Sequence, residues 1–311
     1  MDDIMGVDIS KGTLDVYDLA AKEHRQFSND RSGLKKLAKW VKARLPCIIM
    51  FESTGAYHRG SEQALGHADI QYVKVNPSLS RRFAQACGRL AKTDRVDCEM
   101  LAKMGAALEL SPTPITPPIL HDLRELLSAR RALVKDGSAT RARKETALNA
   151  LLIRQLSRRI RQIEADIKKI DAEMLGIVEA DPSMQSRVDV LSSIPGVGQL
   201  TALIILIDMP EIGSLDRKQV ACLAGLAPQS QSSGKWTGKA RIQGGRRTLR
   251  QAIFMPALVA IRYNPDLKAK YEQLLAAGKE KKLAITAVMR KLLILANALL
   301  RDGRKWTEKP A

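Results

Sequence analysis

The feature that most constrains the fold is a proline-rich segment, SPTPITPP, at residues 111–118. Four of its eight residues are proline, and proline fits neither the interior of a helix nor a central strand. The chain before the segment alternates strand and helix patterns, whereas the chain after it is patterned as helix. We therefore predict a boundary here and three domains, at residues 1–110, 111–182 and 183–311.

The part before the prolines has an α/β pattern. CIIMFE, at 47–52, is continuously apolar, as in a strand of a sheet that is buried on both faces. Helical periodicity predicts the intervening helices. We expect strands at 4–9, 13–20, 24–29, 47–52 and 70–76, and helices at 31–44, 57–66, 77–87 and 94–109.

The part after the prolines is predicted to be all-α. Residues 119–170 hold thirteen Lys or Arg against six acids around a leucine and isoleucine stripe, which is typical of an αα-hairpin or coiled coil with a basic outer face. The position of the break stays open, because Gly137 only weakens a helix. Beyond 183 we expect two helices around IPGVG, an irregular loop over 230–250, helices at 247–262, 266–277 and 280–301, and a frayed tail.

The chain of 311 residues carries 51 Lys plus Arg against 33 Asp plus Glu, a formal net charge of +18. A charge of this size favours a polyanionic partner, and nucleic acid first. The four cysteines have no metal-type spacing and lie in apolar contexts, which indicates reduced core thiols. The N-terminus lacks a signal-peptide pattern, and Arg290 and Lys291 interrupt the longest apolar run. We expect a cytoplasmic protein that does not enter a membrane.

Four acids stand out against this basic background. Asp94 and Asp97 are three residues apart, on the same helical arc as an apolar stripe. Taken alone, they are equally well explained as helix-capping acids. Asp8 lies within the first predicted strand and Glu52 ends the buried one, where acids are rare. If these strands are neighbours, the four carboxylates can converge and hold Mg²⁺ or Mn²⁺ for phosphodiester chemistry.

The motifs GVDISKGTLDV, FESTGAY and KTDRVD, in this order, resemble the RNase H-like (RuvC-like) domain of the DEDD insertion-sequence transposases, which is similar to that of Holliday-junction resolvases. The resemblance continues through IPGVG and AGLAPQSQSSGKWTGKARIQGGRRTLRQAIFMPAL. It implies a mixed-sheet catalytic domain, a coiled coil and a helical C-terminal domain. It also implies DNA recombination guided by a bridge RNA, with a catalytic tetrad of Asp8, Glu52, Asp94 and Asp97.

The same resemblance implies a nucleophilic serine. Ser233, in SSGK, occupies the matching position, although the adjacent Ser232 leaves the register open. The serine would form a covalent phosphoserine link to DNA, and the metal site of the first domain would complete the centre, from the same or a second subunit. Composition alone favours a solvated Ser/Gly linker instead.

Further residues are candidates for nucleic-acid binding. IPGVG resembles a helix-hairpin-helix turn, in which glycines let backbone N–H groups approach a phosphate, but an ordinary helix–helix turn explains it equally well without the family. Each of the basic residues near the acids, taken singly, is better explained as an ordinary surface charge. The candidates are Arg81, Arg82, Arg89 and Lys92 near the acids, Gly196 and Gly198 in IPGVG, and Lys235, Lys239, Arg241, Arg246 and Arg247 around the serine.

The leading hypothesis is an RNA-guided serine recombinase that acts on target and donor DNA as a homodimer or homotetramer. The alternatives are a metal-dependent nuclease or junction resolvase without a serine nucleophile, and a non-catalytic nucleic-acid-binding protein. An actin-like ATPase would also suit GVDISKGTLDV, but the sequence shows no second Asp-containing phosphate loop.

Overall fold

The structure is a computed structural model of the chain, and it describes residues 3–53, 55, 57–88, 94–229, 232–233, 236–238 and 240–308. At Asp94, Ser232, Ser233, Trp236 and Thr237 it describes the backbone only. The chain divides into two compact units, Met1–Pro118 and Ile119–Ala311, and each is described by itself.

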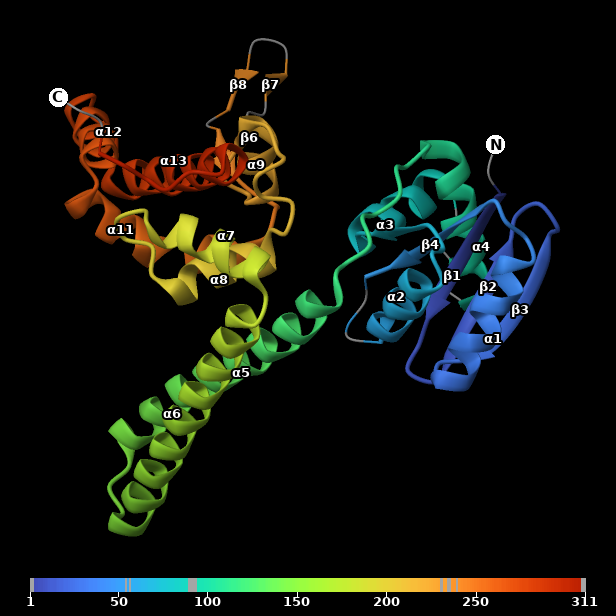
Figure 1. Ribbon diagram of the computed structural model, residues 1–311, viewed down its shortest axis with the longest axis horizontal. Coiled ribbons are helices and arrows are strands. Elements are labelled where there is room, and N and C mark those ends of the chain that lie inside the picture. The colour runs from blue at the N-terminus through green and yellow to red at the C-terminus, as the bar shows by residue number, and fades with distance from the viewer. Residues whose placement is uncertain are drawn as a thin grey trace. The chain divides into compact units, whose positions relative to one another are not determined.

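The first unit is built on a five-stranded mixed sheet, which confirms the expected α/β class (Figure 1). The spatial order of the strands is β3-β2-β1-β4-β5, with β1 antiparallel to β2 and parallel to β4. This arrangement is consistent with an RNase H-like domain. The strands are β1 (Asp3–Ile9), β2 (Thr13–Asp18), β3 (Glu23–Ser28), β4 (Cys47–Glu52) and β5 (Tyr72–Val75).

Helices cover both faces of the sheet, as the alternation of side chains along the strands requires. Met5, Val7 and Phe51 belong to the core on the side of α1 (Arg31–Lys42) and α2 (His58–His67). The neighbouring positions, such as Ile4 and Met50, pack on the opposite side with α3 (Pro77–Ala86) and α4 (Asp94–Leu108).

α4 packs against β1 at backbone distance. A Cβ atom at Gly6 would lie 1.9 Å from the carbonyl oxygen of Cys98 and 2.7 Å from the backbone nitrogen of Ala102. One helical turn further along, a Cβ atom at Gly105 would lie 2.9 Å from Cγ2 of Ile4. Glycine at these two positions lets the helix lie close to the strand. Because Gly6 lies against Cys98 and Ala102 while the earlier Ile4 lies against the later Gly105, α4 runs antiparallel to β1.

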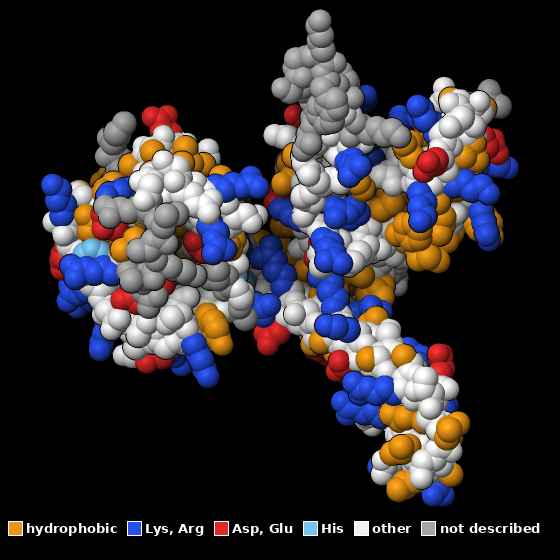
Figure 2. All heavy atoms as spheres, turned by 180° about the vertical axis from the view of Figure 1, so that it is seen from behind, with side chains coloured by type: hydrophobic (Ala, Val, Ile, Leu, Met, Phe, Trp, Pro, Cys, Tyr) orange, Lys and Arg blue, Asp and Glu red, His pale blue; other side chains and the backbone are white. Residues whose placement is uncertain are grey.

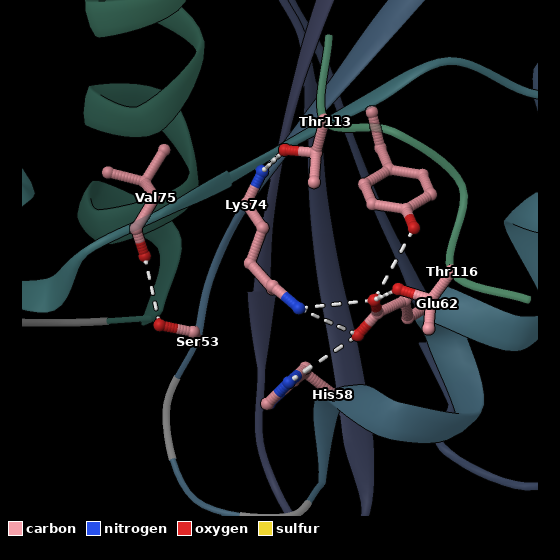
Figure 3. Close-up of polar contacts among 8 residues, drawn as sticks. Ser53, His58, Glu62, Lys74, Val75, Thr113 and Thr116 are labelled. Atoms are coloured by element: carbon pink, nitrogen blue, oxygen red, sulfur yellow. Dashed lines mark hydrogen bonds and ion pairs between the residues drawn. The ribbon is translucent and has the colours of Figure 1, made fainter. Parts of the chain in front are cut away.

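The proline-rich segment is fixed to the edge of the sheet. The backbone N–H of Thr113 donates to the carbonyl oxygen of Tyr72 (2.7 Å), and the Lys74 N–H donates to Oγ1 of Thr113 (2.9 Å). The buried carboxylate of Glu62 accepts from Thr116 Oγ1 (2.8 Å) and from Lys74 Nζ (3.0 Å), as Figure 3 shows. The segment thus covers the exposed edge of β5, where unpaired backbone groups would otherwise remain.

The second unit begins with two long antiparallel helices, α5 (Pro118–Thr146) and α6 (Ala150–Glu179) (Figure 1). The break that the sequence left open falls at residues 147–149, where Asn149 caps α6 by accepting from the Leu151 N–H at 2.9 Å. Gly137 lies inside α5 and faces Ile163 of α6, whose Cγ2 a Cβ atom would contact at 3.4 Å.

Among the described residues of this unit are seven further helices, and they share one apolar core with the base of the α5–α6 hairpin. α13 is long and apolar enough to cross a membrane. Eight of its residues are buried inside the unit, however, as in the central helix of a helical domain. The helices are α7 (Pro182–Ser192), α8 (Gln199–Asp208), α9 (Arg217–Leu223), α10 (Arg247–Ala252), α11 (Phe254–Tyr263), α12 (Pro265–Ala276) and α13 (Lys281–Asp302).

Four expectations are corrected by the structure. The loop over 230–250 is not wholly irregular, because β6 (Pro228–Gln229) pairs with β9 (Arg241–Ile242) and β7 (Ser232–Ser233) pairs with β8 (Trp236–Thr237). The helix expected at 247–262 is two helices that meet at Ile253. The tail is not frayed at Trp306, whose N–H donates to Ser193 Oγ at 2.7 Å and whose ring packs on the core. Cys87 and Cys222 are exposed rather than core thiols.

We predict that Gly6→Ala destabilises the first unit by about 3 kcal/mol, because the added methyl group meets backbone atoms that cannot rotate away. Urea unfolding followed by circular dichroism measures the change. Gly12→Ala is the matched control, because a Cβ atom there meets nothing within 4 Å. Equal unfolding midpoints for the two variants would contradict the close packing of α4 on β1.

Candidate active site

Three carboxylates occupy neighbouring positions on adjacent strands. Asp8 pairs directly with Asp15 across β1 and β2. On the other side of β1, Val7 pairs with Phe51, so that the next residues, Asp8 and Glu52, are neighbours as well. The sheet therefore carries a row of acids, Asp15–Asp8–Glu52, and it meets the condition on which the predicted convergence of Asp8 and Glu52 depended.

α4 brings Asp97 to the same region. Asp8 follows Gly6 by two residues along β1, so both residues lie on the same face of the sheet, which α4 covers. Cys98 and Ala102 lie over Gly6, and the helix runs toward the start of β1 from there. The first turn of α4 is thus level with Asp8, where it places the half-buried Asp97 and the backbone of Asp94. The side chain of Asp94 lies outside the described atoms.

The electrostatics of Cys98 agree with this placement. Burial, first, and then the negative charges of Asp15 and Asp8 together raise the pKa of its thiol to about 12. Both carboxylates are therefore close enough to Cys98 to disfavour a thiolate beneath the first turn of α4. A neutral thiol adds no negative charge to the carboxylates of this region.

Glu52 is oriented by α3, a contact that the sequence analysis missed. The hydroxyl group of the buried Ser80 donates to Oε1 of Glu52 at 2.5 Å. Asn76 caps this helix by accepting from the Ser78 N–H, and Pro77 occupies its first turn. The capping signal NPS was present in the sequence, but only the fold shows that the fourth residue of α3 faces Glu52.

The donor set fits a hard divalent cation, because every candidate ligand offers carboxylate oxygen. Among the described side chains, which exclude that of Asp94, no three His, Cys, Asp or Glu side chains are close enough together to hold one ion. The residues that would hold Mg²⁺ or Mn²⁺ are Asp8, Glu52 and Asp97 together with Asp94.

The candidate serine lies in the second unit, on a short β-ladder. Ser233 pairs with Trp236, and Ser232 pairs with Thr237. The base of the ladder is held by Arg250, which donates to the carbonyl oxygens of Gly244 (2.9 Å) and Gly225 (3.3 Å). A Cβ atom on Gly245 would lie 2.1 Å from the backbone nitrogen of Gly225, so glycine is required where these backbone segments touch.

Comparison with known families decides the identity of the chain. A model of the DEDD transposase domain of the IS110 family matches residues 5–168, more than half of the chain. A second model, for the transposase IS116/IS110/IS902 family, matches residues 188–272. The chain belongs to the IS110/IS116 transposase family.

Individual relatives of this transposase agree with the assignment. The pilin gene-inverting proteins of Moraxella bovis and Moraxella lacunata are each 29% identical to it, over 98% of both chains. An uncharacterized insertion element IS110 protein of Streptomyces coelicolor is 29% identical over 49% of this chain and 37% of its own length. The protein is therefore an enzyme that acts on DNA, and transposase domains of this kind generally depend on divalent metal ions.

The structure distinguishes among the predicted nucleic-acid-binding residues of the transposase. Arg81, Arg82, Arg241 and Arg247 are exposed. Arg246 instead forms a bidentate ion pair with Glu211 at 2.5 and 2.7 Å. Burial raises the pKa of Glu211, but the hydrogen bonds and charge of Arg246 outweigh burial and leave the pKa lowered. Arg89, Lys92, Lys235 and Lys239 lie outside the described residues.

The two glycines of IPGVG have different environments. Gly196 has a φ of +97°, and a Cβ atom there would lie 2.7 Å from the carbonyl oxygen of Pro256, so its small size serves packing against α11. Gly198 is exposed and precedes α8, with nothing within 4 Å of a Cβ atom. Only Gly198 combines an open surface with a helix N-terminus.

Basic side chains are spread over the helical unit and along the α5–α6 hairpin, as Figure 2 shows in blue. Some of these charges are engaged within the hairpin, where Arg130 pairs with Asp171 and Arg141 with Glu164. The excess of basic over acidic residues in this segment leaves a positive surface, which suits a transposase that must hold a polyanion.

We predict that Ser80→Ala raises the Mg²⁺ concentration needed for half-maximal DNA cleavage about tenfold, because a ligand that loses its orienting hydrogen bond binds metal less well. A cleavage titration against Mg²⁺ measures the shift. Ser78→Ala, at an exposed position of the same helix, is the control. Superimposable titration curves for the two variants would show that Ser80 does not position Glu52 for metal binding.

Proposed function

We propose that this transposase cuts and rejoins DNA by attack of Ser233 on a phosphodiester, assisted by divalent metal at Asp8, Glu52, Asp94 and Asp97 and guided by a bridge RNA. The observation that carries the proposal is the placement of Asp8 and Glu52 on adjacent parallel strands, beneath the first turn of α4. Acids do not collect on the buried face of a sheet without a balancing charge.

The residues of the first unit have separate parts in this proposal. Asp8 and Glu52 would bind metal from the strands, and Asp94 and Asp97 from the helix. Ser80 holds the Glu52 carboxylate in place. A bound Mg²⁺ or Mn²⁺ ion would supply positive charge to the phosphate oxygens during attack.

The serine step conserves the phosphodiester linkage. Oγ of Ser233 forms a bond to phosphorus while the bond from phosphorus to a deoxyribose oxygen breaks. The serine proton passes to water, and the departing deoxyribose oxygen takes up a proton. The reverse reaction with a different deoxyribose hydroxyl rejoins the strands without another energy source. The β7–β8 ladder would present the serine away from its base, and the exposed Arg241 and Arg247 nearby favour a phosphate.

The guide RNA and the assembly belong to the same proposal. The basic surface of the predicted coiled-coil segment would hold RNA or DNA by its backbone, and a guide that pairs with DNA leaves little base-reading chemistry for the protein. At the hairpin tip Leu148 is 97% exposed, beside the exposed Leu151 and Leu152, which favours burial in a homodimer or homotetramer. We expect target DNA, donor DNA and a non-coding guide RNA as partners in the cytoplasm.

The division of labour follows the predicted domains. Residues 1–110 would carry the metal site, 111–182 the linker and the nucleic-acid-binding hairpin, and 183–311 the serine loop. Gly198, at the N-terminus of α8, would contact a phosphate in the manner of a helix-hairpin-helix turn.

A metal-dependent nuclease or junction resolvase is the second candidate function. It is favoured by the acid row, which would suffice for hydrolysis by metal-bound water without any serine. The two functions differ in one product, since only a serine nucleophile leaves protein covalently attached to DNA.

We predict that Ser233→Ala abolishes the covalent protein–DNA adduct and strand exchange, while Asp8→Asn abolishes all cleavage. Reaction on end-labelled DNA, followed by denaturing gels with and without protease, measures both. Ser232→Ala is the control and should retain the adduct. Continued cleavage by Ser233→Ala with no adduct from the wild-type protein would establish the resolvase function instead.

We predict that RNA copurifies with the protein when the DNA flanking its reading frame is expressed together with it. Sequencing should recover one structured transcript, and ribonuclease treatment before assembly should abolish strand exchange. A preparation free of RNA that recombines DNA at the wild-type rate would refute guidance by RNA.

A further inference from the structure

The candidate serine belongs to a hairpin that has little rigidity of its own. β6 pairs with β9, and β7 pairs with β8 between them in the sequence, so the two ladders are successive parts of one hairpin. Ser233, which pairs with Trp236, is the last paired residue of β7. Each ladder has only two residue pairs, and an isolated two-stranded hairpin is marginally stable at best. The position of Ser233 therefore depends on how the base of the hairpin is held.

One arginine side chain bridges the two sides of this base. Nη1 of Arg250 donates to the carbonyl oxygens of Ala224 (3.4 Å) and Gly225 (3.3 Å), which precede the hairpin. The same nitrogen donates to the carbonyl oxygen of Gly244 (2.9 Å), which follows the hairpin. Gly225 has a φ of +66°, and a Cβ atom there would lie 2.2 Å from Nη1 of Arg250. The glycine thus makes room for an arginine that ties together the chain segments before and after the serine.

A second arginine anchors the base to the body of the helical unit. The backbone N–H of Arg246 donates to the carbonyl oxygen of Leu223 at 2.7 Å, which again joins the two sides of the hairpin. The Arg246 guanidinium group forms its bidentate ion pair with Glu211, which is followed by the buried core residue Ile212. A bidentate pair of arginine and carboxylate fixes orientation as well as supplying energy. The base of the hairpin is therefore fixed relative to the core.

These two arginines differ from the arginine that lies between them in the sequence. Arg247 is exposed, whereas Arg246 and Arg250 are half-buried. The guanidinium groups of Arg246 and Arg250 donate to oxygen atoms of the protein itself. A residue that binds phosphate must instead offer its donors to the ligand. The sequence gives the three arginines the same appearance, and the contacts separate them into two kinds.

We infer that Arg246 and Arg250 are positioning residues for the serine step, and that together with Glu211 they fix the hairpin that carries Ser233. We call these three side chains the hairpin clamp. The inference rests on the proposed function, in which Ser233 is the nucleophile. Attack on phosphorus requires the serine oxygen to be held close to one position, and a displacement of about 1 Å can lower the rate about a hundredfold. The clamp would act through the hairpin rather than by contact with DNA.

A phosphate-binding role for Arg246 predicts a different outcome. In that case Arg246→Gln would weaken DNA binding, while Glu211→Gln would leave it unchanged or strengthen it by releasing a cation. The clamp predicts that both substitutions lower the rate of adduct formation at saturating DNA and leave the dissociation constant for DNA unchanged. Because the two side chains act as one pair, the double variant should be no slower than the slower single variant.

The first measurement is the rate of covalent adduct formation against DNA concentration, with the full-length protein. We expect Arg250→Met, Arg246→Gln and Glu211→Gln each to lower the rate at saturating DNA about tenfold or more, with an unchanged half-saturating DNA concentration. Arg247→Gln is the matched control from the same segment. As an exposed cation, Arg247 should instead affect the half-saturating DNA concentration, which rises when a phosphate contact is lost.

The second measurement is hydrogen exchange of peptides covering 221–229 and 240–250, without nucleic acid. Arg250→Met leaves the carbonyl groups of Ala224 and Gly225 without this donor, so both peptides should exchange faster than in the wild-type protein, while peptides of α13 should not. Arg247→Gln should exchange like the wild-type protein. If Arg250→Met unfolds the whole unit, Glu211→Gln carries the test, because it replaces a carboxylate with an amide of the same size.

The outcomes for the clamp and for the proposed function are distinct. If the wild-type protein forms the adduct and the clamp variants form it at the wild-type saturated rate, the clamp inference alone is wrong. Wild-type hydrogen exchange in the clamp variants would overturn it as well, and so would weaker DNA binding at an unchanged saturated rate. If the wild-type protein forms no adduct, the serine step of the proposed function is refuted, and the positioning role falls with it.

Discussion

The close approach of α4 to β1 is the contact on which the candidate active site depends. Gly6 and Gly105 have no side chain at the two points where helix and strands approach most closely, so the α4 backbone near Cys98 and Ala102 lies directly on β1 at Gly6. This brings the first turn of α4 down to the level of Asp8, where Asp97 can join acids that come from the sheet. A larger residue at Gly6 would lift the helix, and the carboxylates would then belong to two separate surfaces. Two positions without side chains thus determine whether four charged positions can act together.

The first unit could be predicted closely from the sequence because its signals are local. The apolar run CIIMFE, the alternation in the first strand and the capped helix at Pro77 each define an element within a few residues. The proximity of Asp8 and Glu52 could also be predicted, because acids are rare in buried strands and two of them there indicate a shared site. Asp15 and Ser80 were missed because their meaning depends on register. Which residue stands opposite Asp8, and which residue of α3 faces Glu52, are set by pairing across the chain rather than by local pattern.

The helical unit shows the same limit in another form. The break between α5 and α6 lies at Asn149, a capping residue, and not at the helix-weakening Gly137, which is buried inside α5 opposite Ile163. In the same way Gly225, Gly244 and Gly245 indicated an irregular loop by composition, whereas the fold uses them for contacts between backbone segments that hold a short β-ladder. A glycine marks either flexibility or close packing, and sequence alone does not distinguish the two.

The opposed charges of the chain can be understood together. A protein with a net charge of +18 attracts DNA and RNA at long range without regard to sequence. The acids oppose that attraction unless cations neutralise them. Without bound cations, a row of carboxylates in the sheet repels phosphate and destabilises the fold. With bound cations, the same row would attract phosphate. Affinity for nucleic acid at the acid row would then depend on metal, while affinity over the exposed arginines of α3 and the helical unit would not. If the proposed metal site is correct, that separation would let the transposase hold its substrate first and admit the phosphate to the acid row only with metal in place.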